Sequence, residues 1–146
     1  MSHKLPNDPK KFGPGMWISI HILAYHAKNK EDQLLYCKTI RTLCSNITCL
    51  TCREHAIEFI KHNPPEKIVS ENNEKAMFKW SCDLHNNTNR IKKPPSPLMN
   101  WETIYKEYEL NSPESDTLTI EENEIILKTP FQRANDRIYQ QTITKK

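Results

Sequence analysis

Glycine is scarce in this chain, with 2 residues in 146, so a glycine-rich loop that would bring the backbone close to a dinucleotide phosphate is disfavoured. No run of 18 apolar residues is present, which argues against a membrane-spanning helix. The N-terminal residues also lack the apolar centre of a signal peptide, so we expect a cytoplasmic protein that is not secreted.

Basic charge is not concentrated in one block either. The formal net charge of +3 is spread along the chain without a long basic block, and nothing in this pattern favours nucleic-acid binding. The length suffices for one domain and little more. We expect an N-terminal arm over residues 1–12, one domain over residues 13–110, and an irregular C-terminal tail over residues 111–146.

Apolar residues recur with the helical period almost everywhere before residue 110, which predicts an all-helical protein. We expect Pro14 to begin the first helix and Thr48 to cap the third. Asn100 should cap a short fifth helix. The predicted helices cover residues 14–27, 31–47, 49–63 and 73–92, followed by the short one over residues 101–108.

Two of the five cysteines, Cys49 and Cys52, are separated by two residues and open the predicted third helix. This spacing brings the sulfurs within bonding reach, so the pair can cycle between dithiol and disulfide. Unpaired amide groups and the helix dipole favour a thiolate at that position. Two ordinary buried cysteines are the alternative interpretation.

A second motif lies on the predicted fourth helix, where Cys82, His85, Asn86 and Asn89 share one stripe. Asparagine disfavours helix interiors, and Asn87 adds a third one, so a bound ligand could compensate for the cluster. A solvent-facing polar surface would also explain it. A redox cysteine pair beside a polar pocket on a helix suggests a bound electron carrier.

A structural zinc module is the alternative from another functional class. The two motifs together offer a tetrahedral donor set of three thiols and one imidazole: Cys49, Cys52, Cys82 and His85. The gap from Cys52 to Cys82 is longer than usual in compact zinc modules, and zinc would leave Trp17 and His21 without a role. We therefore rank this interpretation second and expect no metal site.

The order and spacing of these parts resemble the FAD-dependent sulfhydryl oxidases of the ERV/ALR family, in particular the short forms of large cytoplasmic DNA viruses. The resemblance extends over residues 13–108 and rests on Trp17-x-x-x-His21, Cys49-x-x-Cys52, Trp80-x-Cys82 and His85-Asn86-x-x-Asn89. It implies a four-helix bundle with a short fifth helix, noncovalently bound FAD, and a homodimer formed through the first helices.

The resemblance also implies roles for individual residues. Cys49 would meet the substrate and Cys52 would lie beside the flavin, so that electrons pass from protein dithiols to FAD and then to dioxygen, giving hydrogen peroxide. His55, one turn after Cys52, could position the flavin, although an ordinary exposed histidine is the alternative. The remaining implied cofactor residues are Gly13, Trp17, His21, Cys52, Cys82, His85, Asn86, Asn89, one of Lys92 or Lys93, and Tyr108.

The other cysteines bear on the substrate. Cys82 has no cysteine at the position where many family members carry its partner, so we expect it to be unpaired. Cys37 and Cys44 lie about 10 Å apart along a helix, beyond direct disulfide reach, and are interpreted as small buried hydrophobic residues. Without a second redox pair in the chain, a separate thioredoxin-like protein would deliver electrons. A viral enzyme of this kind would work in the host cytoplasm or the virion.

Overall fold

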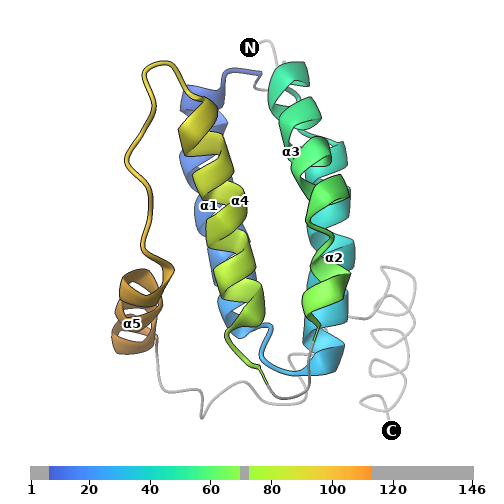
Figure 1. The fold of residues 1–146 in the computed structure, drawn as a ribbon, viewed down its shortest axis with the longest axis vertical. Helices are drawn as coiled ribbons and strands as arrows, with labels where there is room; N and C mark the ends of the chain where they lie inside the picture. The colour runs from blue at the N-terminus through green and yellow to red at the C-terminus, as the bar shows by residue number, and fades with distance from the viewer. Residues whose placement is uncertain (1–6, 70–72, 113–146) are drawn as a thin grey trace, which may run out of the picture. The chain divides into compact units, whose positions relative to one another are not determined.

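The computed structural model describes residues 7–69 and 73–112, which are helical apart from short connections (Figure 1). The chain divides into two compact units, Met1–Leu110 and Asn111–Lys146. The second unit lies outside the described residues except for Asn111 and Ser112, and so does the predicted tail. The elements are α1 (Pro9–His26), α2 (Lys30–Ser45), α3 (Leu50–His62), the short 3-10 helix η1 (Pro65–Ile68), α4 (Ala76–Ile91) and α5 (Trp101–Asn111).

The first helix begins at Pro9, so the prediction that Pro14 begins it is wrong. Asp8 is the N-cap, and its side chain accepts a hydrogen bond from the Lys10 backbone N–H at 3.0 Å. Pro9 then occupies the first helical position, where a missing N–H carries no penalty. Pro14 lies inside α1 and removes only one backbone hydrogen bond in the second turn.

The cap of α3 also differs from the prediction. Cys49 is the N-cap in place of Thr48, because the Cys52 backbone N–H donates to the Cys49 sulfur at 3.3 Å. The cap of α5 is as predicted, since the side-chain oxygen of Asn100 accepts from the Thr103 backbone N–H at 3.0 Å.

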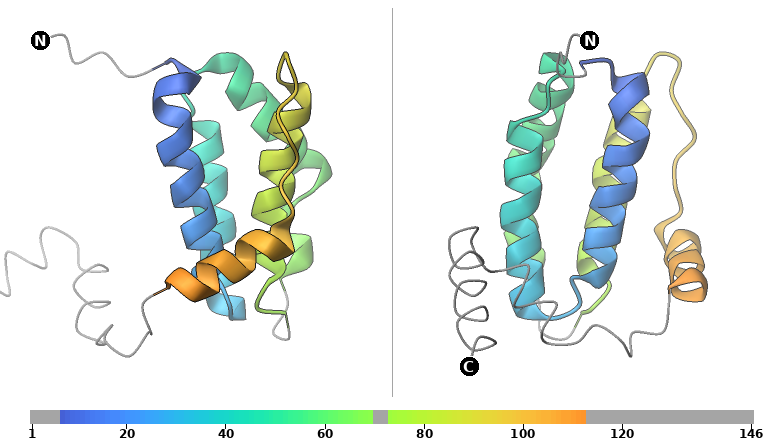
Figure 2. Two further views of the ribbon diagram at one scale, coloured as in Figure 1. Left: turned by 90° about the vertical axis from the view of Figure 1, so that its left-hand side faces the viewer. Right: turned by 180° about the vertical axis from the view of Figure 1, so that it is seen from behind.

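Four helices form a bundle, in which α1 packs against α4 and α2, and α3 packs against α2 and α4 (Figures 1 and 2). The fifth helix joins through Tyr105, whose ring contacts Tyr25 of α1 and Phe78 of α4, both at 5.2 Å between centroids. Each large apolar side chain buried here contributes about 1.5–3 kcal/mol to stability. Within the described residues, the all-helical prediction is confirmed.

The core takes apolar side chains from every helix of the bundle. Its fully buried members include Ile20, Ala24, Ile40, Met77, Phe78, Leu84 and Tyr105. None of the helices in the described segments is long and apolar enough to cross a lipid bilayer.

Candidate functional site

The cysteine pair lies at the start of α3. Cys49 and Cys52 are joined by a disulfide, and both side chains are half-buried against the core. The N-terminal end of a helix stabilises negative charge, so the same geometry favours a thiolate when the disulfide opens. The predicted redox pair is therefore assembled in a form suited to thiol–disulfide exchange.

Arg53 holds the segment that precedes the pair. Its Nε donates to the Ile47 carbonyl oxygen at 2.8 Å, across the turn between α2 and α3. This bond fixes the approach of the chain to Cys49. Arg53 is not among the residues predicted from the sequence motifs, although its position directly after the cysteine pair is a usable signal.

A polar cluster links α1 to α4. The His21 side chain is buried, with its Nδ1 at 2.9 Å from Ser81 Oγ and its Nε2 at 2.9 Å from His85 Nδ1. The Ser81 hydroxyl in turn donates to the Phe78 carbonyl oxygen at 2.7 Å. Ser81 is not among the predicted site residues, although a polar side chain one turn before His85 on the buried face of the helix is a usable signal.

The Trp17 indole covers the His85 imidazole. The ring centroids lie 3.9 Å apart and the planes differ by 2°, so the rings stack face to face. Burial lowers the pKa of His21 to about 4, and burial together with His21 and Lys92 lowers the pKa of His85 to about 4. Both imidazoles are therefore neutral at physiological pH, and the cluster carries no charge of its own.

The two predicted cofactor asparagines on α4 bind the connection to α5. Asn86 donates from Nδ2 to the Met99 carbonyl at 2.9 Å and accepts from the Met99 N–H at 2.7 Å. Asn89 donates to the Pro97 carbonyl at 3.1 Å, and Lys92 Nζ donates to Asn89 Oδ1 at 3.3 Å. Hydrogen bonds to the loop backbone thus offset the unfavourable helix propensity of these asparagines.

The remaining predicted cofactor residues are more scattered. Gly13 is buried on α1, one turn before Trp17, whereas His55 is exposed on α3 and Lys93 is exposed beyond α4. Tyr108 packs against Phe78 and Tyr25, with ring centroids 5.1 and 5.7 Å apart. Phe78 lies 5.9 Å from His21, so Tyr108 reaches the polar cluster only through another ring.

The three other cysteines are buried and free, as the sequence predicts. Burial raises the pKa of Cys37 and Cys44 to about 11 and that of Cys82 to about 12. A protonated buried thiol is a poor nucleophile, so these side chains act as small apolar residues in this structure. Cys82 has no exposed surface and belongs to the core.

The tetrahedral zinc set is not brought together. Within residues 7–69 and 73–112, no group of three or more His, Cys, Asp or Glu side chains is placed to hold a metal ion. Cys49 and Cys52 bond to each other, and His85 pairs with His21. The structure thus gives the zinc alternative no support.

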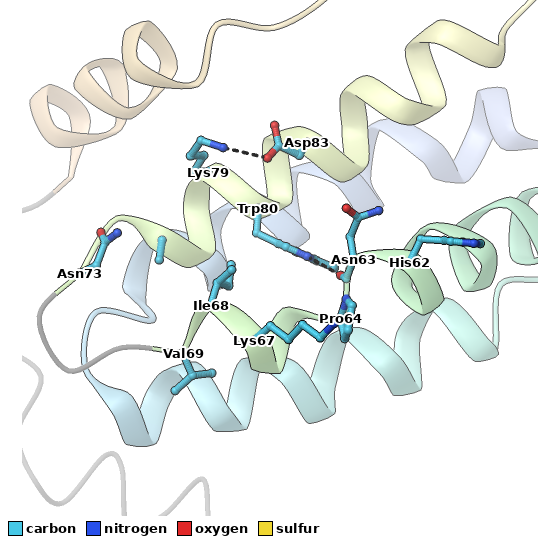
Figure 3. Close-up of a pocket in the computed structure, with 11 residues that line it drawn as sticks. His62, Asn63, Pro64, Lys67, Ile68, Val69, Asn73, Lys79, Trp80 and Asp83 are labelled. Atoms are coloured by element: carbon cyan, nitrogen blue, oxygen red, sulfur yellow. Dashed lines mark hydrogen bonds and ion pairs between the residues drawn. The ribbon is translucent and has the colours of Figure 1, made fainter.

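A pocket of about 600 Å³ lies at the opposite end of α3 (Figure 3). A helix of 13 residues is about 20 Å long, which separates this pocket from the cysteine pair. Its walls include Trp80, whose indole N–H donates to the Asn63 carbonyl at 2.9 Å, and the ion pair of Lys79 with Asp83. None of the predicted cofactor residues lines it.

Comparison with known proteins identifies the family to which the chain belongs. The model of the Erv1/Alr family matches residues 14–108, which cover most of α1 and α5 and all of the helices between them. A protein named FAD-linked sulfhydryl oxidase from African swine fever virus (isolate Pig/Kenya/KEN-50/1950) is 26% identical over 100 residues, 66% of this chain and 81% of the relative. Its counterpart from isolate Tick/Malawi/Lil 20-1/1983 is 25% identical over 105 residues, 69% of this chain and 85% of the relative.

A third relative comes from fowlpox virus (strain NVSL) and is named "Probable FAD-linked sulfhydryl oxidase". It is 29% identical over 80 residues, 55% of this chain and 80% of the relative. No solved structure matches the chain significantly. Because the family model covers well over half of the chain, including the cysteine pair and the polar cluster, this protein belongs to the Erv1/Alr family.

Proposed function

We propose that this protein is a FAD-linked sulfhydryl oxidase that forms disulfide bonds in protein substrates. Membership of the Erv1/Alr family and the names of the viral relatives support this activity. The observation that carries the proposal is the disulfide between Cys49 and Cys52 at the start of α3. A disulfide at a helix N-terminus is ready to accept two electrons from a dithiol.

The exchange step follows from this geometry. A substrate thiolate attacks the Cys49 sulfur, a mixed disulfide forms, and Cys52 leaves as a thiolate that the start of α3 stabilises. A second substrate thiol, once deprotonated, attacks the substrate sulfur of the mixed disulfide and releases Cys49. The substrate has then lost two electrons and two protons, and the cysteine pair is reduced. We assign the leaving role to Cys52 by family resemblance.

The residues near Trp17 fit the FAD that the family implies. Gly13 is buried, yet a Cβ placed there would meet no heavy atom within 4 Å, so a space adjoins α1 one turn before Trp17. Trp17 and His85 offer aromatic faces that suit a planar ring system. The exposed cations of Lys92 and Lys93 suit a diphosphate.

We propose that the cofactor is held by the side chains selected above: Gly13, Trp17, His21, Cys52, His55, Cys82, His85, Asn86, Asn89, Lys92 or Lys93, and Tyr108. When bound, FAD supplies the two-electron acceptor that reoxidises the cysteine pair and passes electrons to dioxygen, giving hydrogen peroxide. The protein contributes the position of Cys52 and the neutral imidazoles of His21 and His85.

We further propose a homodimer formed through the first helices. Ile18 and Ile22 lie one turn apart on α1 and are 57% and 44% exposed, and Leu23 beside them is 48% exposed. Apolar side chains grouped on one outer face favour contact with another protein surface. A second copy of the same helix would cover them by two-fold symmetry.

The electron donor is proposed to be a separate thioredoxin-like protein. The chain has 5 cysteines, and the three outside the redox pair are free and buried, so no second pair at the surface can relay electrons. We also propose that the protein acts in the cytoplasm of an infected cell or in a virion, because the relatives that it matches are viral proteins.

Oxygen uptake tests the proposed function. Purified flavin-loaded protein should consume dioxygen when a dithiol is added and should release one hydrogen peroxide per disulfide formed. A flavin-loaded protein that oxidises no dithiol would contradict the proposal.

A further inference from the structure

The hydrogen bonds between α4 and α1 form a chain that begins at a backbone carbonyl and ends at His85. Ser81 Oγ lies 2.7 Å from the Phe78 carbonyl oxygen. A carbonyl oxygen can only accept, so the single proton of the Ser81 hydroxyl points at Phe78. The direction of this first bond is therefore fixed by chemistry and does not depend on the histidines.

The serine bond fixes the protonation of His21. Because the Ser81 hydroxyl has given its proton to Phe78, Ser81 Oγ can only accept from His21 Nδ1 at 2.9 Å. A neutral imidazole carries one proton, so His21 holds it on Nδ1 and its Nε2 is an acceptor. Burial keeps His21 neutral by lowering its pKa to about 4.

The same reasoning extends to His85. His21 Nε2 accepts, so His85 Nδ1 must donate across the 2.9 Å that separates them. His85 Nε2 then carries a bare lone pair, and it has no hydrogen-bond partner among the described residues. The Trp17 indole stacked at 3.9 Å holds the plane of the ring and therefore the direction of that lone pair.

We propose that Ser81 is a positioning residue for the cofactor, which sets His85, through His21, to present Nε2 as an acceptor for an N–H or O–H group of the bound FAD. This inference rests on the proposed function. A bare ring nitrogen attracts a donor group, such as a ring N–H, an amino group or a hydroxyl, and repels a phosphate oxygen. The diphosphate must therefore bind elsewhere, and an amino, ring N–H or hydroxyl group lies against His85.

Nitrogen NMR of isotope-labelled histidine in the flavin-free protein tests the chain of bonds directly. We expect His21 and His85 both to carry their proton on Nδ1. In the Ser81→Ala variant, His21 Nδ1 loses its hydrogen-bond partner. Both rings should then shift toward the form protonated on Nε2, because an unpaired acceptor at His21 Nδ1 costs less free energy than an unpaired buried N–H there. A wild-type His85 protonated on Nε2 would overturn the inference, even if the variant fails to fold.

FAD binding tests the role of the acceptor. Ser81→Ala should weaken FAD affinity roughly three- to tenfold, the range expected for one neutral hydrogen bond. Ser19→Ala is the matched control, since its hydroxyl also bonds a helix carbonyl, that of Gly15, but on the exposed side of α1. The control should bind FAD like the wild type.

The outcomes separate the two proposals. If the rings of Ser81→Ala change protonation while FAD affinity stays at the wild-type value, the assigned role of His85 is wrong and the proposed function stands. If the wild-type protein takes up no FAD at all, the proposed function fails, and the cofactor part of this inference fails with it.

Discussion

The indole of Trp17 and the imidazole of His85 lie in parallel planes with their centroids 3.9 Å apart, which joins the first helix of the bundle to the fourth. His21 and Ser81 meet at the same level through hydrogen bonds. This stack joins the two helices that carry most of the candidate cofactor residues, and it gives the first test of the site.

Removing the imidazole should impair flavin retention. His85→Ala loses the ring stacked on Trp17 and the hydrogen bond to His21, so the purified variant should contain less flavin than the wild type, with affinity lower by about tenfold or more. The ratio of flavin absorbance to protein absorbance measures the flavin content. His62→Ala, at the exposed far end of α3, is the control. Equal flavin content in both variants would mean that α4 is not the binding wall.

The side chain of Asn86 should contribute to the stability of the flavin-free fold. Asn86→Ala leaves the N–H and carbonyl of Met99 without their partner, so we expect a loss of about 1–3 kcal/mol in the free energy of unfolding. Urea denaturation of the flavin-free protein measures it. Asn87→Ala is matched for the change in helix propensity and should stay within about 0.5 kcal/mol of the wild type. Equal losses in the two variants would refute the anchoring role.

Stability should fall as the pH drops from about 6.5 to about 4. The pKa of His21 and His85 is lowered from 6.5 to about 4 in the folded protein, so the unfolded chain binds protons in this window that the folded chain does not. The stability contributed by the neutral imidazoles is complete above that window and is lost as the pH falls through it.

The pH series is measured by urea denaturation of the flavin-free protein. The double variant His21→Gln/His85→Gln removes both groups, so its stability should depend less on pH in the same window. A wild-type slope no steeper than that of the double variant would contradict the burial of neutral imidazoles.

The α1 surface should control assembly. Light scattering should give the mass of two chains for the wild-type protein and the mass of one chain for the Ile22→Asp variant. The variant should not dimerise because its carboxylate would be buried without a partner in the centre of an apolar contact. Leu110→Asp changes another exposed apolar residue, on α5, and should leave the dimer intact. A wild-type monomer, or a dimeric Ile22→Asp variant, would exclude this interface.

The helices were predictable from the sequence because apolar residues recur on their inner faces with the helical period. Tyr36 and Ile40 on α2 and Ile47 just after it are buried, as this period predicts. The first residues of the helices were harder to predict. Pro14 has the chemistry of a first helical residue, but Asp8 caps the helix earlier. Cys49 caps α3 through a sulfur, which the usual list of capping side chains does not include.

The candidate site was predictable where it depends on local spacing. Cys49 and Cys52 are close in sequence, and their disulfide follows from the helical turn between them. The asparagines were harder, because the partner of Asn86 is Met99, and that contact depends on the path of the loop after α4. Ser81 was missed because its role depends on His21, which a different helix brings to it.

Anaerobic reduction of the bound flavin tests most directly the claim that Cys49 and Cys52 carry electrons from substrate to FAD. When a dithiol is added to the purified protein without oxygen, the visible absorbance of oxidised flavin should bleach, and it should return on exposure to air. Cys52→Ser should remain yellow throughout, whereas Cys37→Ala, which changes a buried free thiol, should bleach like the wild type. A wild-type protein without flavin, or a Cys52→Ser variant that bleaches at the wild-type rate, would contradict the account.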